Sequence, residues 1–212
     1  NKARIAEAFA DDAQQKGCNC ILTYGSSDSN MCRVMTMICK KRGMDCVVLS
    51  ASEEGQEYVY SINSKIAEDS GFPFYTCDKS EVGSSLEKII SQLTADGKKV
   101  YYIYSPGNIP AGVSAYKKVY EEISEYGENY DYIFTASGTG ITQAGLVCGK
   151  WFLDNKAPCK NSDIIGISIS RTAEREIGII KDYVSAYMKN VGAAIDDAEK
   201  AYKSINLTDK YF

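Results

Sequence analysis

Short apolar runs alternate along the chain with stretches in which apolar residues recur every three or four positions. The runs are typical of strands, and the periodic stretches are typical of amphipathic helices. The predicted strands are residues 20–24, 46–50, 72–77, 100–104, 130–135 and 164–169. The predicted helices are residues 3–16, 30–42, 55–69, 84–93, 112–126, 142–153 and, with a break near Gly192, 172–204.

Local signals define several of these boundaries. Gly43 directly follows a predicted helix and is expected to end it. Ser84 or Ser85 is expected to cap the helix that follows, because serine side chains accept hydrogen bonds from a first helical turn. Four apolar residues of that helix are expected to face inward: Leu86, Ile89, Ile90 and Leu93. Pro73 cannot donate a hydrogen bond to a sheet, so its strand is expected at an edge.

The alternation of strands with helices predicts an α/β fold. Right-handed crossovers through helices place successive strands parallel in a sheet. Several predicted strands are almost wholly apolar, as expected when helices cover both faces of the sheet. The polar stretch 94–97 is a candidate crossing between two lobes.

Composition narrows the class of protein. The chain has 212 residues, 44% hydrophobic and 25% charged, which is typical of a globular protein with one domain or two small ones. The net charge is −4 and the lysines are scattered, which argues against a nucleic-acid surface. No apolar run reaches the roughly 18 residues of a membrane span. Residues 1–10 lack the apolar stretch of a signal peptide.

The eight cysteines are interpreted as reduced thiols, several of them buried in apolar runs. They are Cys18, Cys20, Cys32, Cys39, Cys46, Cys77, Cys148 and Cys159. Thiols stay reduced in the cytoplasm, where we expect the protein. The chain contains no histidine, which excludes Ser–His and Cys–His catalysis, and the cysteine spacing does not indicate a metal site. Proton transfer is therefore left to Lys, Tyr, Asp, Glu, Cys or a cofactor.

The segment Ser137–Thr142 is a candidate anion-binding loop. It follows a predicted strand and opens a predicted helix, and Gly138 and Gly140 let the backbone approach a ligand closely. Free N–H groups at a helix start favour a phosphate, and Thr139 and Thr142 add hydroxyl donors. The spacing fits neither a dinucleotide nor a nucleoside-triphosphate fingerprint. Taken alone, the segment could also be a plain glycine-rich turn.

Two further segments carry weaker signals. In the loop before the helix 30–42, Ser29 or Asn30 is either a helix cap or a ligand contact. At the N-terminus stands Asn1-Lys2-Ala3-Arg4, whose lysine, taken alone, would be a solvated charge. Each segment has a simple structural explanation by itself, but their order along the chain adds information.

Taken together, the segments resemble a known pattern. Fold-type II pyridoxal-phosphate (PLP) enzymes, the tryptophan synthase β-like superfamily, carry Gly-Asn-Lys-x-Arg, then Ser-Asn-His-x-Arg, and far downstream a glycine–threonine phosphate loop. The counterparts are residues 1–4, 29–33 and 138–145. Residues 105–116 resemble the family's Pro-x-Gly-Gly-Ser-Asn-Pro-x-Gly-x-x-Gly-Tyr. The chain is thus similar, along essentially its whole length, to the family of D-cysteine desulfhydrase and 1-aminocyclopropane-1-carboxylate (ACC) deaminase.

The resemblance implies a role for each matching residue. Lys2 and Ser29 would be catalytic: Lys2 would hold PLP covalently and move the substrate α-proton, and Ser29 would lie near the substrate carboxylate. Asn30 would contact the pyridine ring or its phenolic oxygen. The residues that would bind the cofactor phosphate are Gly138, Thr139, Gly140 and Thr142.

Some positions depart from the family's pattern. Met31 stands where histidine is usual, Asp28 where glutamine is common, and Ile141 replaces a small residue of the phosphate loop. Residues 108–109 replace a small polar pair. These departures leave the substrate open within the family. Because the family also has residues before the lysine and a later Gly-Tyr-Gly segment, we expect a fragment shortened at both ends.

The resemblance implies a partial tryptophan synthase β-like fold with two lobes and PLP between them. The larger lobe would contain residues 1–17 and 98–212, and a smaller inserted lobe would contain residues 18–97. The family is commonly dimeric, so a homodimer or another oligomer is expected.

The activity implied by the resemblance is that of a PLP-dependent lyase or deaminase acting on a small amino acid. A D-cysteine-like substrate would give pyruvate, ammonia and sulfide, and an ACC-like substrate is the other option. The alternatives are a β-replacement enzyme similar to cysteine synthase, and an inactive fragment that serves as an interaction module. A Rossmann-like nucleotide binder is a third alternative, because Glu53 and Glu54 follow a predicted strand, although no glycine fingerprint precedes it.

Overall fold

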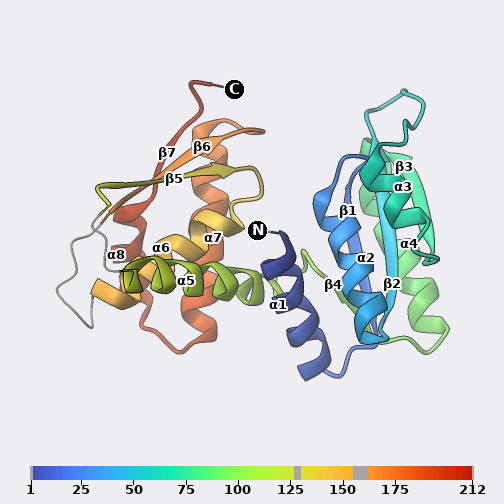
Figure 1. Cartoon of the computed structure of the whole chain (residues 1–212), viewed down its shortest axis with the longest axis horizontal. Helices are drawn as coiled ribbons and strands as arrows, with labels where there is room; N and C mark the ends of the chain where they lie inside the picture. Colours follow the sequence, from blue (N-terminus) through green and yellow to red (C-terminus); the bar gives the residue numbers. More distant parts are fainter. Residues whose placement is uncertain (1, 127–129, 155–161, 212) are drawn as a thin grey trace. The chain divides into compact units, whose positions relative to one another are not determined.

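A computed structural model describes residues 2–126, 130–154 and 162–211 (Figure 1). The chain divides into two compact units, Asn1–Asn108 and Ile109–Phe212. The lobe boundaries expected from the resemblance, with residues 1–17 joined to residues 98–212, stay a prediction. Asn1 and Cys159, named in the sequence analysis, lie outside the described residues.

Residues 1–108 form a four-stranded parallel sheet in the order β3-β2-β1-β4. The strands are β1 (Cys20–Ser26), β2 (Asp45–Ser52), β3 (Phe74–Asp78) and β4 (Val100–Tyr102). The helices are α1 (Lys2–Gln15), α2 (Asn30–Arg42), α3 (Ile62–Glu68) and α4 (Val82–Ala95), with a 3-10 turn at Lys79–Glu81 before α4. β3 lies at an edge of the sheet, as the proline at its start predicts.

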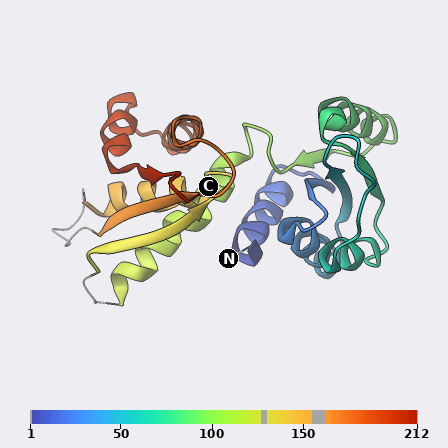
Figure 2. The ribbon, with the colours of Figure 1, turned by 90° about the horizontal axis from the view of Figure 1, so that it is seen from above.

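Helices cover both faces of this sheet. α1, α2 and α3 lie on one face and α4 on the other (Figure 2). Facing α4, the sheet buries Cys20, Leu22 and Val47. The four residues of α4 that were predicted to face inward pack against this cluster: Leu86, Ile89, Ile90 and Leu93. On the opposite face, the buried ring of Phe9 in α1 lies 6.3 Å from the ring of Tyr101 in β4.

Residues 109–212 form a three-stranded parallel sheet in the order β5-β6-β7. The strands are β5 (Tyr132–Ser137), β6 (Asp163–Ser168) and β7 (Asn206–Thr208). The helices are α5 (Ile109–Glu125), α6 (Ile141–Asp154), α7 (Ala173–Asn190) and α8 (Ile195–Ala201), followed by a 3-10 turn at Tyr202–Ser204. The predicted break near Gly192 is confirmed, because this glycine adopts a φ of 73° between α7 and α8.

Two glycines allow α6 to pack closely against α5. A Cβ atom on Gly145 would lie 2.4 Å from the Cβ of Tyr116. A Cβ atom on Gly149 would lie 2.5 Å from the Cβ of Tyr120. Carbon atoms cannot approach so closely, so any larger residue at either position would force the two helices apart.

The parallel sheets confirm the predicted α/β fold, but the predicted helix 55–69 is wrong in its first half. α3 begins only at Ile62, and the side chain of Ser61 caps it by accepting from the N–H groups of Asn63 and Ser64. The preceding residues instead pack on β3, where the ring of Tyr60 stacks 6.2 Å from that of Phe74. Aromatic contacts with the sheet therefore replace a helical turn here.

Two further boundaries differ from the predictions. α4 begins at Val82, so neither Ser84 nor Ser85 is its cap, and the helix continues the preceding 3-10 turn without a side-chain cap. The strand β7 was not predicted, because its three residues are too few to show an alternating pattern. In contrast, α2 has the predicted bounds and ends at Gly43, whose φ of 65° needs a glycine.

Within residues 2–126, 130–154 and 162–211, every helix is too short or too polar to cross a membrane.

Candidate functional site

Lys2 is the first residue of α1 and is partly buried. Burial lowers the pKa of its amine below the ordinary value of 10.5, because a charged amine loses hydration there. The helix that carries it is held to α2, where Arg42 forms ion pairs with Glu7 and Asp11. A lysine with a lowered pKa is more readily neutral, which is what a nucleophile or a base requires.

Ser29 occupies the N-cap position of α2. Its hydroxyl oxygen accepts a hydrogen bond from the N–H of Cys32 at 3.2 Å. The loop can turn this tightly because residue 25 is glycine: a Cβ on Gly25 would lie 2.4 Å from the Ser29 hydroxyl oxygen. The capping interpretation is therefore confirmed for Ser29, and its contact with a ligand stays a prediction.

Asn30 begins α2 and is exposed. Its side-chain oxygen accepts a hydrogen bond from the guanidinium of Arg33 at 2.9 Å. This bond orients the carboxamide, and the side-chain amide nitrogen remains a donor for which the described residues show no acceptor. The arginine of the Ser-Asn-x-x-Arg segment thus positions the asparagine within the same helical turn.

The loop before α2 is also held from α3, which the sequence did not indicate. The Ser61 hydroxyl donates to the carbonyl oxygen of Ser27 at 2.5 Å. The side-chain amide of Asn63 donates to the carbonyl oxygen of Asp28 at 2.8 Å. The Ser61-x-x-Ser64 capping box at the start of α3 was the available signal, but it reveals a helix start and not the loop that the helix holds.

The glycine-rich segment connects β5 to α6, as predicted. Gly140 has a φ of 79°, and its carbonyl oxygen accepts the hydrogen bond of the Ala144 N–H at 2.9 Å. The N–H groups earlier in this first turn have no helical carbonyl in front of them. A Cβ on Gly140 would lie 3.2 Å from Ile180 of α7, so a larger residue would be both strained and crowded. The loop therefore offers backbone donors and two partly buried threonines, Thr139 and Thr142, to an anion.

Behind this loop lies a partly buried ionic network that the sequence did not reveal. The carboxylate of Glu176 in α7 is wholly buried and forms an ion pair of 2.8 Å with Arg171. It also accepts a hydrogen bond of 2.8 Å from the hydroxyl of Ser137 at the end of β5. Arg171 and Ser170 both donate to the carbonyl oxygen of Gly138.

The predicted site residues fall into two groups. Lys2, Ser29 and Asn30 belong to residues 1–108, and the loop residues 138–142 belong to residues 109–212. Two of the departures from the family's pattern are core residues, because Met31 and Ile141 are both buried. In the described part of the chain, no group of three or more His, Cys, Asp or Glu side chains is arranged to hold a metal ion.

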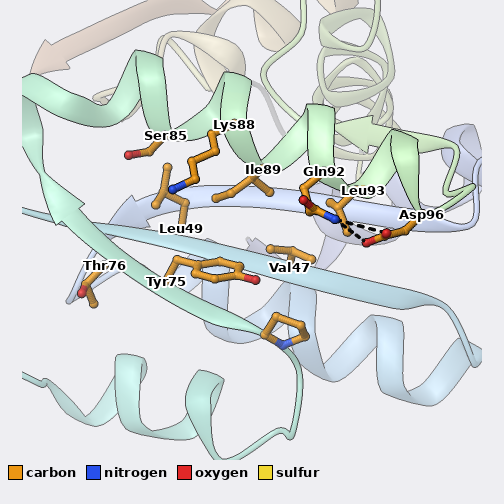
Figure 3. Close-up of a pocket in the computed structure, with 11 residues that line it drawn as sticks. Val47, Leu49, Tyr75, Thr76, Ser85, Lys88, Ile89, Gln92, Leu93 and Asp96 are labelled. Atoms are coloured by element: carbon orange, nitrogen blue, oxygen red, sulfur yellow. Dashed lines mark hydrogen bonds between the residues drawn. The ribbon is translucent and has the colours of Figure 1, made fainter.

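A separate pocket of about 430 Å³ lies between α4 and the strands β2 and β3 (Figure 3). Its floor is apolar, with Val47 and Leu49 facing Ile89 of α4. None of the predicted site residues lines it. Ligands of open parallel sheets bind beyond the carboxyl ends of the strands, whereas this pocket lies on the face of the sheet. It is therefore not part of the candidate site.

Residues 1–203 match the family profile described as "Pyridoxal-phosphate dependent enzyme". The chain belongs to this family. A protein of Pyrococcus abyssi that bears the provisional name 1-aminocyclopropane-1-carboxylate deaminase is 27% identical over 197 residues, covering 91% of this chain and 58% of the relative. A protein of the same provisional name from Pyrococcus horikoshii is 28% identical over 205 residues, covering 95% of this chain and 61% of the relative.

Solved structures agree with this assignment to the PLP family. The crystal structure of an ACC deaminase homologue has a TM-score of 0.79 and 25% identity, covering 99% of this chain and 61% of that one. A hydrogen sulfide-producing enzyme from Fusobacterium nucleatum has a TM-score of 0.59 and 20% identity, covering 81% of this chain and 54% of that one, and shows the fold alone. The chain spans about three fifths of the length of the curated relatives it matches, 58% and 61%.

The side chains and backbone groups of this PLP-family chain fit the cofactor. The first turn of α6 supplies N–H donors that have no helical carbonyl partner, beside Thr139 and Thr142, and a phosphate group binds to such a donor set. Lys2 supplies an amine whose burial favours the neutral form that attacks an aldehyde. The chemistry that the cofactor brings when bound is an electron sink for negative charge at the substrate α-carbon.

Proposed function

We propose that this chain carries the cofactor-binding part of a PLP-dependent lyase or deaminase that acts on a small amino acid. The observation that carries the proposal is the family match over residues 1–203, a range that spans both Lys2 and the glycine-rich loop. Two relatives that cover more than nine tenths of the chain are named as ACC deaminases, which favours deamination or elimination over other PLP chemistry.

Each site residue has a proposed task. Lys2 would hold the cofactor covalently and carry the proton removed from the substrate α-carbon, which its lowered pKa supports. Ser29 and Asn30, fixed by the cap and by Arg33, would orient the substrate carboxylate and the cofactor ring. The loop residues that would bind the phosphate are Gly138, Thr139, Gly140 and Thr142.

For the substrate we propose D-cysteine or ACC. With D-cysteine, Lys2 removes the α-proton, the sulfur leaves as hydrogen sulfide, and water releases ammonia and pyruvate from the remaining carbon skeleton. The reaction of D-cysteine to hydrogen sulfide, ammonia and pyruvate balances with water as the only second reactant. The neighbours named O-ureido-L-serine synthase and cysteine synthase are 20% and 18% identical and support the fold alone, so we keep β-replacement as an outcome of the test.

The test starts from cofactor binding. PLP is added to the wild-type chain, to Lys2→Ala and to the control Lys41→Ala, which removes an exposed lysine of α2. The expected result is a visible absorbance band of lysine-linked cofactor in the wild type and in Lys41→Ala, but not in Lys2→Ala. Absence of the band from the wild type would contradict the proposal and favour a non-catalytic interaction module.

Turnover then separates the substrates. Keto-acid and ammonia release is measured with D-cysteine and with ACC, and hydrogen sulfide release with D-cysteine. Formation of keto acid from either substrate supports a lyase or deaminase. Consumption of an activated serine with added sulfide, without keto acid, would show β-replacement instead.

We also propose an oligomer, with a homodimer as the simplest form. Tyr132 and Phe134 on the edge strand β5 are 59% and 65% exposed, with their rings 6.1 Å apart. An exposed aromatic pair of this kind favours association. Light scattering after gel filtration should give twice the monomer mass, and Phe134→Ser should lower it. A monomeric wild type would contradict this proposal.

For the location of the protein we propose the cytoplasm. The support is that the seven described cysteines are free thiols. Cell fractionation with an antibody to the chain tests this, and recovery in an oxidising compartment would contradict it.

A further inference from the structure

Glu176 places a negative charge in the interior of the protein, close to the glycine-rich loop. Its carboxylate is wholly buried, directly behind a loop that offers donors to a negatively charged phosphate. A buried charge is costly unless it is paired and hydrogen-bonded. Both of its oxygens are used, one by the hydroxyl of Ser137 and the other by the guanidinium of Arg171.

Arg171 connects this carboxylate to the loop backbone. Its nitrogen Nη1 donates both to Glu176 and to the carbonyl oxygen of Gly138. The hydroxyl of Ser170 donates to the same carbonyl oxygen at 3.1 Å. The backbone of Arg171 is held as well, because Ser168 closes the turn after β6 by donating to the carbonyl oxygen of Arg171 at 2.6 Å.

This connection determines where one N–H group of the loop points. The carbonyl of Gly138 and the N–H of Thr139 belong to one peptide unit, which is planar and trans, so they point in opposite directions. Because Arg171 holds the carbonyl, the N–H of Thr139 must point away from the network. We propose that Arg171 and Glu176 are positioning residues that aim the Thr139 N–H at the cofactor phosphate, an inference that rests on the proposed function.

A purely electrostatic effect of Glu176 and a positioning role for it predict opposite changes in PLP binding for one substitution. Glu176→Gln removes a negative charge near the phosphate site, which by electrostatics alone would strengthen binding of an anion. If Glu176 instead acts by holding Arg171 against the Gly138 carbonyl, the same substitution weakens binding. The sign of the change in PLP affinity therefore decides between the two.

The binding experiment compares PLP with pyridoxal, which lacks the phosphate. Arg171→Met and Glu176→Gln are each expected to weaken PLP binding about tenfold, the size of one charge-assisted hydrogen bond, with pyridoxal binding unchanged. Arg171→Lys, which keeps the charge but loses the planar fork, is expected to restore only part of the affinity. Arg175→Met removes an exposed arginine from α7, the helix that carries Glu176, and should leave the binding of both ligands unchanged. Equal losses for both ligands, or tighter PLP binding by Glu176→Gln, would overturn the proposal.

A measurement without the cofactor separates this proposal from the proposed function. The ¹H–¹⁵N heteronuclear NOE of the Thr139 and Gly140 amides reports the order of the loop in the ligand-free chain. We expect values typical of rigid backbone in the wild type and in Arg175→Met, and lower values in Arg171→Met and Glu176→Gln. If the wild type binds no PLP, the proposed function fails, and the NOE still decides on the positioning role. Unchanged NOE values in both variants would refute that role even if PLP binds.

Discussion

The side chain of Gln143 occupies the space that a side chain at residue 166 would need. A Cβ atom on Gly166 would lie 1.9 Å from the side-chain oxygen of Gln143, which is wholly buried. The amide nitrogen of Gln143 donates to the carbonyl oxygen of Asn206 at 2.7 Å, which links α6 to β7 across the sheet. Gly166 in the central strand β6 therefore makes room for a polar link between α6 and β7.

Gly166→Ala is expected to destabilise the protein by about 1–3 kcal/mol, because the added methyl group must displace Gln143 from a packed site. Urea unfolding followed by circular dichroism measures this. Gly178→Ala is the control, since no atom of the described residues lies within 4 Å of a Cβ at this exposed helix position. The control should gain up to about 1 kcal/mol. Equal stability of the two variants would contradict the crowding at residue 166.

Ser29 can be tested as a cap separately from its proposed ligand role. Ser29→Ala should lower the free energy of unfolding by about 1 kcal/mol through loss of the hydrogen bond to Cys32. Ser29→Asp keeps a capping oxygen and should retain most of the stability. In turnover assays, however, the added carboxylate should repel an amino-acid carboxylate and raise KM. If Ser29→Asp were as unstable as Ser29→Ala, the capping assignment would be wrong.

The lowered pKa of Lys2 predicts its reactivity. Burial favours the neutral amine, so the midpoint of its modification by an aldehyde and a reductant should lie below pH 10.5. The same shift means that the unfolded chain binds the proton more tightly, so this residue makes folding more favourable as pH rises from the lowered pKa toward 10.5. Peptide mapping across a pH series, with the midpoint and not the rate compared, measures the shift. A midpoint at or above 10.5 would contradict it.

Two buried thiols should resist alkylation. Burial raises the pKa of Cys20 to about 11 and that of Cys148 to about 12. The thiolate is the nucleophile, so neither should react with iodoacetamide in the native protein near neutral pH, and both should react in urea. Cys18, which is partly exposed, serves as the comparison. Native samples are analysed by mass spectrometry, and modification of Cys148 in them would contradict the prediction.

Asn63→Ala should loosen the loop before α2. The substitution removes the donor to the Asp28 carbonyl, worth about 1 kcal/mol, so amide exchange in residues 26–30 should accelerate about fivefold. Asn190→Ala changes an exposed residue at the end of α7 and should leave that exchange unaltered. Hydrogen exchange with mass spectrometry distinguishes these outcomes, and equal exchange in both variants would show that Ser61 holds the loop without Asn63.

Local signals predicted the elements that depend on a few neighbouring residues. The end of α2 at Gly43 and the loop that opens α6 are of this kind, because a left-handed glycine or a glycine-rich turn acts within one helical turn. The prediction failed where a residue contacts others that are distant from it in the sequence. Tyr60 was expected in a helix, and it stacks instead on Phe74 of a strand that comes later in the sequence.

The residues that hold the candidate site in place could not be predicted, for the same reason. Glu176 bonds Ser137 across 39 positions, and Asn63 bonds Asp28 across 35. Nothing in the local pattern of a surface helix marks one of its carboxylates as buried. The residues that resemble the family's motifs could be predicted, whereas the residues that hold those motifs in place required the structure.

The glycine pair of α6 limits which substitutions this protein can accept without an effect on the loop. Gly145 and Gly149 fix the spacing between α5 and α6, and the glycine-rich loop is the beginning of the same helix α6. A methyl group at either position would tilt α6 or push it away from α5. The N-terminal end of α6, which carries the N–H donors of the loop, would shift by a comparable amount. A substitution at Gly149, about two helical turns from the loop, would thereby alter the fit of an anion that it never touches.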